Sequence, residues 1–153
     1  MITYHKPSNI CDVTRGVILH GCNAQGVMGS GVAKQLRAKY PDIYSRYVTH
    51  LNDLRDLNKD PLGTICIQRV TGHLAVCNMI TQEYYGRDGR QYVSYGAIED
   101  CLENVLDWMG DYSIPIHVPY LIGAGLGGGE EKIILGIFEE VLGNYNLNFH
   151  IWK

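Results

Sequence analysis

Glycine is concentrated in three stretches of this chain. The sequence contains 18 glycines in 153 residues, and most of them lie in residues 21–31, 86–96 and 123–129. The average share of glycine in proteins is only about 7%. Glycine serves positive φ angles or the close approach of a backbone to a ligand. Turns account well for isolated glycines only, so three dense clusters favour a backbone that approaches a ligand.

Short apolar runs and helical patterns alternate along the chain. The apolar runs predict strands over residues 2–4, 17–20, 62–68, 74–80, 114–121 and 147–152. The first helical pattern opens near Ser30 and restarts at Pro41, and two further patterns cover residues 98–109 and 133–142. This order, ββαββαβαβ, predicts an α/β layered domain. The length fits one domain over residues 1–153.

Each glycine cluster follows a predicted strand. Gly21 comes directly after His20, Gly86 comes shortly after Ile80, and Gly123 comes soon after the fifth apolar run. Ligands of open α/β sheets bind outside the carboxyl ends of the strands. Two of these loops also open helices, whose free N–H groups receive phosphate. The sequence therefore predicts one cleft built by three loops. It contains no Walker lysine pattern, and no G-x-G-x-x-G lies directly between a predicted strand and helix with an acidic residue about 20 positions further on.

Charge and cysteine spacing exclude several classes of protein. A formal charge of −3 with 13 scattered basic residues argues against bulk nucleic-acid binding. No apolar run approaches the ~20 residues that cross a bilayer, and no signal-peptide pattern is present. We therefore expect a soluble, cytoplasmic, monomeric protein without membrane contact. The five cysteines are widely spaced without a C-x-x-C pair, from which we expect reduced thiols, no metal site and no cofactor.

Two glycine-rich segments carry a family resemblance. Residues 20–33, HGCNAQGVMGSGVA, resemble the first ligand loop of macrodomains, and residues 121–128, LIGAGLGG, resemble their phosphate-binding loop. Upstream, Cys11-Asp12-Val13-Thr14 is similar to the family's Gly-Asp-Ile-Thr segment, with cysteine in place of glycine. The resemblance covers nearly the whole chain. It implies a three-layer α/β/α macrodomain with a central mixed sheet of about six strands.

The resemblance also implies a binding mode for ADP-ribose. Asp12 accepts a hydrogen bond from the adenine amino group, Val13 makes the neighbouring contact, and Asn23 holds the distal ribose hydroxyls. The other expected ligand contacts are Gly29, Ser30, Gly31, Val32, Gly123, Ala124, Gly125, Leu126 and Gly127. Arg87 and Arg90 are candidates for the diphosphate or a terminal phosphate. The expected partner is ADP-ribose or ADP-ribose 1''-phosphate.

One branch of the family resembles this chain at further positions. The pattern His-x-Cys-Asn-x-x-Gly from His20, Tyr40-Pro41 at the helix break and the loop TQEYYGRD over residues 81–88 are similar to ADP-ribose 1''-phosphate phosphatases. This similarity implies catalytic roles for His20 as acid or base, for Asn23 at the ribose, and for Asp88, which orients water or holds His20. The alternatives are a core-bonded histidine at His20 and turn residues at Asn23 and Asp88.

Two other functions remain open. A reader of free or protein-linked ADP-ribose needs the same glycine loops but no titrating pair of His20 and Asp88. A glycohydrolase that strips ADP-ribose from macromolecules is less favoured. The lysine-dependent members of that branch have lysine where this chain has Gln82, and the protein-directed ones have aspartate where it has Gly127.

Overall fold

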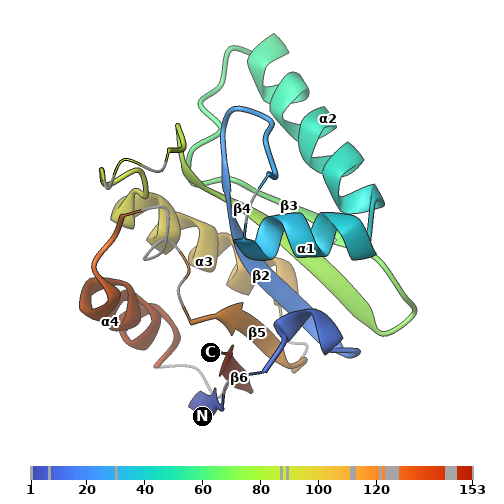
Figure 1. Ribbon diagram of the computed structural model, residues 1–153, viewed down its shortest axis with the longest axis vertical. Helices are drawn as coiled ribbons and strands as arrows, with labels where there is room; N and C mark the ends of the chain where they lie inside the picture. The colour runs from blue at the N-terminus through green and yellow to red at the C-terminus, as the bar shows by residue number, and fades with distance from the viewer. Residues whose placement is uncertain are drawn as a thin grey trace.

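The computed structural model describes residues 2–6, 8–29, 31–86, 88, 90–110, 113–120, 122, 128–143 and 148–152 (Figure 1). The described part contains one six-stranded sheet with the order β1-β6-β5-β2-β4-β3. The strands are β1 (Ile2–His5), β2 (Gly16–Asn23), β3 (Ile65–Arg69), β4 (Leu74–Gln82), β5 (Ile116–Pro119) and β6 (Phe149–Trp152). Neighbouring strands are parallel except β3 and β4, which are joined by a short turn that permits only antiparallel pairing. The predicted mixed sheet is confirmed.

Four α-helices and a short 3₁₀ helix lie in these residue ranges. They are η1 (Ile10–Asp12), α1 (Gly31–Lys39), α2 (Asp42–Asp56), α3 (Tyr95–Met109) and α4 (Glu131–Leu142). The first predicted helical pattern is divided at Pro41, because proline has no N–H to continue the hydrogen bonds of α1. α3 begins after Ser94, whose hydroxyl accepts from Ala97 N at 3.1 Å. None of the helices in the described part is long and apolar enough to span a bilayer.

The helices cover both faces of the sheet, which gives the predicted three layers. Successive side chains of a strand point to opposite faces, so alternate residues of β2 enter different cores. Val17 and Leu19 pack with residues of α3 and α4. Ile18 packs with Leu36 of α1 and Ile43 of α2 on the other face. Because both faces are covered, β2 and β4 are apolar along most of their length.

β2 is longer than the sequence predicts. The apolar run ended at His20, but β2 continues to Asn23 and stays paired with β4 as far as Gln82. Gly21 therefore lies within the strand and not in the loop after it, which corrects the prediction. The reason is tertiary: pairing with β4 keeps a segment extended that has turn-forming residues in its own sequence.

Three loops follow parallel strands at one edge of the sheet. The first loop (residues 24–30) joins β2 to α1, the middle loop (83–94) joins β4 to α3, and the second loop (120–130) joins β5 to α4. Because β2, β4 and β5 are parallel, their carboxyl ends share this edge, where ligands of open α/β sheets bind.

Candidate functional site

The ends of β2, β4 and β5 meet at Gly21. A Cβ atom on Gly21 would lie 2.9 Å from Thr81 Oγ1 and 3.5 Å from Ile122 Cγ1. The hydroxyl of Thr81 is buried and has no hydrogen-bond partner in the described part of the chain. An unpaired buried hydroxyl is costly, which makes Thr81 Oγ1 a candidate contact for a polar ligand group. Thr81 is the first residue of the segment TQEYYGRD, but that similarity assigned no role to its hydroxyl, and only its position near the end of a buried strand could have pointed to one.

Asn23, at the end of β2, shapes the first loop. Its Nδ2 donates to Val27 O at 2.8 Å, and its Oδ1 accepts from Gln25 N at 2.9 Å. The residue is 8% exposed. Both ends of the amide are occupied within the loop, which corresponds to the turn alternative for this residue. Its contact with the distal ribose stays a prediction.

Two tyrosines of α2 are hydrogen-bonded to the backbone of the first loop. Tyr47 Oη donates to Asn23 O at 2.6 Å and accepts from Gly26 N at 3.1 Å. Tyr44 Oη donates to Gly26 O at 2.9 Å. Both backbone groups of Gly26, which has a φ of +81°, are thus bonded to α2. These anchors hold the first loop in one shape before any ligand arrives, and no sequence motif indicated them.

His20 lies in the core between the sheet and α2. It is 1% exposed, and its Nε2 donates to Asn78 Oδ1 at 2.6 Å. As the neighbour of Gly21 in a strand, it points to the opposite face from the Gly21 junction. Burial lowers the pKa of His20 to about 4, although the bond to Asn78 opposes this shift, so the ring is neutral at pH 7. This geometry matches the core alternative, and the acid–base role stays a prediction.

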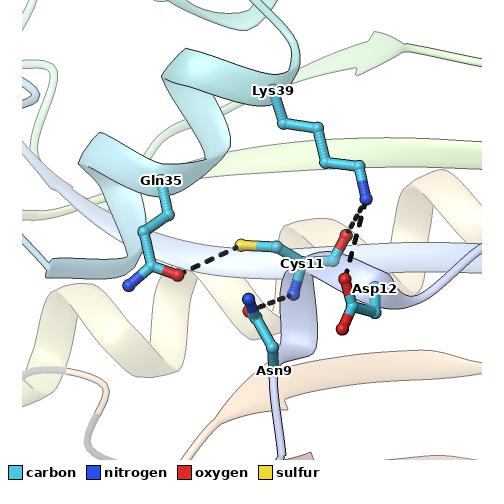
Figure 2. Close-up of polar contacts among 5 residues, drawn as sticks. All are labelled: Asn9, Cys11, Asp12, Gln35 and Lys39. Carbon is cyan, nitrogen blue, oxygen red and sulfur yellow. Dashed lines mark hydrogen bonds and ion pairs between the residues drawn. The ribbon is translucent and has the colours of Figure 1, made fainter.

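η1 is fixed against the C-terminal half of α1. Figure 2 shows Lys39 and Gln35 of α1 directed onto η1: Lys39 Nζ donates to Cys11 O at 2.6 Å, and Cys11 Sγ donates to Gln35 Oε1 at 3.8 Å. Asn9 caps η1, because its Oδ1 accepts from Cys11 N at 2.9 Å. Cys11, which replaces the glycine of the similar family segment, is therefore a packing residue of the η1–α1 contact.

Asp12 and Val13 occupy different environments. The Asp12 side chain is 79% exposed, and its Oδ1 lies 4.0 Å from Lys39 Nζ (Figure 2). An exposed pair at this distance is weak, so the carboxylate is available to an adenine amino group. Val13 is buried in a core with Ile10 and Ile18. Exposure suits the predicted role of Asp12, and burial leaves Val13 mainly its backbone for a ligand.

The middle loop is closed at its base and touches the second loop. Gln82 forms an antiparallel bridge with Val93, which brings the two ends of the loop together. Gly128, with a φ of +71°, lies so close to this loop that a Cβ there would overlap Arg90 O. The second and middle loops are therefore in backbone contact.

Asp88 is an exposed residue of the middle loop. Its Oδ1 accepts from Tyr92 Oη at 2.8 Å, and its Oδ2 lies 3.3 Å from Arg90 Nε. The bond from Tyr92 lowers the pKa of Asp88, so the carboxylate is ionised at neutral pH. None of its polar contacts in the described ranges involves His20. The predicted catalytic role of Asp88 stays a prediction.

The remaining predicted contacts belong to the glycine loops. Gly29 is exposed, Gly31 has a φ of +60° and begins α1, and Val32 packs partly buried against the core beneath α1. Outside the described residues lie Ser30, Arg87, Gly123, Ala124, Gly125, Leu126 and Gly127. Their roles at the diphosphate stay predictions.

The cysteines are free thiols, and all five are buried. Burial raises the pKa of each thiol, and a protonated thiol is a poor nucleophile and metal ligand. Within the described ranges, no three or more His, Cys, Asp or Glu side chains are grouped so as to hold a metal ion.

The sequence matches no family model. It is 32% identical over 127 residues to an uncharacterized 17.5 kDa protein of Enterobacteria phage T4. The matched region covers 80% of this chain and 77% of the phage protein, so the two proteins belong to one family. A macrodomain protein from Streptomyces coelicolor has the same fold, with a TM-score of 0.80, 24% identity and coverage of 100% of this chain and 99% of that chain. This chain is a macrodomain. A Bacteroides thetaiotaomicron protein of unknown function aligns with 99% of the macrodomain and 97% of its own chain, with a TM-score of 0.82 and 27% identity.

Two further similar proteins are named for ADP-ribose or its phosphate. DarTG from Thermosipho africanus, solved in complex with ADP-ribose, aligns with 90% of the macrodomain and 38% of its own chain, with a TM-score of 0.67 and 19% identity. An ADP-ribose 1''-phosphate phosphatase from Scheffersomyces stipitis is 46% identical over 49 residues, which are 32% of the macrodomain and 27% of the phosphatase. The family resemblance read from the motifs is confirmed.

Proposed function

We propose that this macrodomain binds ADP-ribose and ADP-ribose 1''-phosphate, and that it hydrolyses the second to ADP-ribose and phosphate. The observation that carries the proposal is the junction of Gly21, Thr81 and Ile122, where three parallel strands end at the start of the glycine loops. Ligands of α/β sheets bind at such edges, and helix N-termini bind phosphate. The DarTG complex with ADP-ribose and the partial match to a phosphatase support this ligand class.

For binding, Asp12 contacts the adenine, and the two glycine loops, including Gly31 and residues 123–127, bind the diphosphate. Lys39, at the end of α1, holds η1 and so places the Asp12 carboxylate beside the C-terminal half of α1. α1 has 9 residues and is therefore about 13 Å long. A nucleoside diphosphate in extended form covers a similar length, from adenine at η1 to phosphate at the N-terminus of α1.

For hydrolysis, a phosphate monoester needs charge stabilisation, a positioned water and a proton source. The ionised carboxylate of Asp88 is exposed and is suited to accept a hydrogen bond from the attacking water. Asn23 keeps the first loop in the shape that the distal ribose would meet. His20 supports this edge from the core through its bond to Asn78.

The burial of His20 favours a second candidate function, a reader that binds ADP-ribose without turnover. A ring that is 1% exposed and neutral at pH 7 has no direct path to a leaving oxygen. A reader needs only the contacts of the cleft with ADP-ribose. Such contacts stabilise the ground state and the transition state equally and therefore do not by themselves accelerate hydrolysis.

The test measures binding and turnover separately. The purified protein is titrated with ADP-ribose by calorimetry, and it is incubated with ADP-ribose 1''-phosphate while free phosphate is measured. Binding together with phosphate release in proportion to protein concentration supports the phosphatase, and binding without release supports the reader. If the protein binds neither ADP-ribose nor ADP-ribose 1''-phosphate, the proposal is contradicted. Full-rate release by Gly21→Ala, which fills the strand-end junction, would contradict turnover at this junction.

A further inference from the structure

Arg90 is seated where the middle loop meets the second loop. A Cβ on Gly128 would overlap Arg90 O, so only glycine fits at this contact, with its φ of +71°. Gly128 directly follows residues 123–127, to which the proposed function assigns the diphosphate. A second contact lies close by: Glu130 N, at the end of the second loop, donates to Oη of Tyr95, the first residue of α3, at 2.9 Å. The backbone of Arg90 is therefore held beside the end of the second loop.

The guanidinium of Arg90 is oriented by Asp88. Asp88 Oδ2 lies 3.3 Å from Arg90 Nε, and Asp88 Oδ1 accepts from Arg90 N at 3.2 Å. Tyr92 Oη donates to Asp88 Oδ1 at 2.8 Å, and the hydroxyl end of Tyr92 lies against Gly86, where any Cβ would overlap it. Asp88 is thus fixed between Tyr92 and Arg90, although all three side chains belong to a loop.

One edge of Arg90 is open. Its side chain is 80% exposed, and its contact with Asp88 engages Nε. The two Nη groups have no hydrogen-bond or ion-pair partner among the described residues. A guanidinium with a free Nη edge binds a phosphate through two parallel hydrogen bonds, which the point charge of lysine does not.

We propose that Arg90 is a specificity-determining residue, which binds the terminal phosphate of ADP-ribose 1''-phosphate and so favours this ligand over ADP-ribose. Asp88 is its positioning residue. The inference rests on the proposed function, because it takes the ADP-ribose part of the ligand to lie in the cleft. ADP-ribose carries a neutral hydroxyl where the 1''-phosphate carries negative charge, so a cation at this place distinguishes the two ligands.

The test compares the Kd values of the two ligands by rapid-mixing fluorescence, before hydrolysis proceeds. Arg90→Gln should raise the Kd of ADP-ribose 1''-phosphate about tenfold or more, the loss expected for a charge-assisted hydrogen bond, and leave the Kd of ADP-ribose unchanged. Arg90→Lys keeps the positive charge but lacks the planar guanidinium that forms two parallel hydrogen bonds, so its loss of affinity for ADP-ribose 1''-phosphate should be intermediate. Tyr92→Phe removes the hydrogen bond to Asp88 without a change of charge. It should cause a smaller rise in the Kd of ADP-ribose 1''-phosphate and leave the Kd of ADP-ribose unchanged.

Arg69→Gln is the matched control. Arg69 is also exposed, but it ends β3, which runs antiparallel to β4 and so finishes at the opposite edge of the sheet. An unchanged ratio of the two Kd values in Arg90→Gln overturns the inference alone, since ADP-ribose still binds. An equal loss in Arg69→Gln also overturns it, because the effect is then one of net charge. If the wild type binds neither ligand, the proposed function fails and the inference with it.

Discussion

His20 and Asn78 form a buried hydrogen bond of 2.6 Å between register partners on β2 and β4. An amide oxygen only accepts, so Nε2 of His20 carries the proton. Asn78 Nδ2 donates to Ile43 O at 3.2 Å, and the pair thereby joins the sheet to α2. Removal of His20 should therefore affect stability, and separately any proton transfer in which the ring takes part.

His20→Ala is expected to lower the free energy of unfolding by about 1–3 kcal/mol, because Asn78 Oδ1 loses its donor in the core. If His20 also transfers a proton, phosphate release should slow by roughly 10²-fold or more, while ADP-ribose affinity barely changes. Urea denaturation, a phosphate assay and calorimetry measure the three quantities. Asn78→Ala breaks the same bond and keeps the imidazole, so equal slowing in both variants contradicts proton transfer by His20.

The free energy of unfolding is expected to fall as the pH drops from 6.5 to about 4. These limits are the pKa of His20 in the unfolded chain, 6.5, and in the folded chain, about 4. In that window the unfolded chain binds a proton at His20 that the folded chain does not, so acid favours unfolding. The loss from His20 is at most about 3 kcal/mol. His117, whose pKa burial also lowers to about 4, acts in the same direction. Urea unfolding between about pH 7.5 and about pH 4.5 should show a smaller loss in His20→Gln, and an equal loss would contradict the linkage.

Asp12→Ala is expected to weaken ADP-ribose binding by about 1–3 kcal/mol, because the adenine amino group loses its acceptor. This corresponds to about tenfold or more in Kd, which calorimetry measures. Asp56→Ala removes an exposed carboxylate at the end of α2 and serves as the control for net charge. Equal affinities of wild type and Asp12→Ala would remove the adenine assignment.

Gly21→Ala should destabilise the domain by about 1–3 kcal/mol, the cost of overpacking a filled interior, and should weaken ADP-ribose binding. Its new methyl group would lie 2.9 Å from Thr81 Oγ1 at the junction of the three strands. At Gly72 a Cβ would meet nothing within 4 Å, so Gly72→Ala should change neither property. Thermal unfolding and calorimetry on the pair provide the test, and identical behaviour of the two variants would rule out a crowded junction at Gly21.

Tyr47→Phe should loosen the first loop and weaken ADP-ribose binding, because Tyr47 Oη bonds both Asn23 O and Gly26 N. Leaving such buried groups unpaired costs about 1–3 kcal/mol. Tyr44→Phe loses only the bond to Gly26 O and should have the smaller effect. Urea denaturation and calorimetry compare the two variants, and an equal or reversed order would mean that Tyr47 is not the main anchor.

The strands and helices were largely predictable, because their signals are local. Alternation and helical periodicity repeat within a few residues, and Pro41 divides the first helical pattern wherever it is placed in a fold. The glycine clusters and the segment around Asp12 were likewise visible as patterns along the chain. The order of the strands in the sheet was not, since it depends on which segments pair across long stretches of chain.

The sequence by itself determined the elements, the glycine loops and the family resemblance, whereas only the tertiary structure decided what several candidate side chains touch. His20 was expected at the end of a strand, but pairing with β4 extends β2 to Asn23 and leaves the ring in the core beneath α2. Arg90 meets Gly128 from a distant part of the chain. Such contacts follow from strand register and loop packing, and a shift of one residue in register would turn each side chain of a strand to the opposite face.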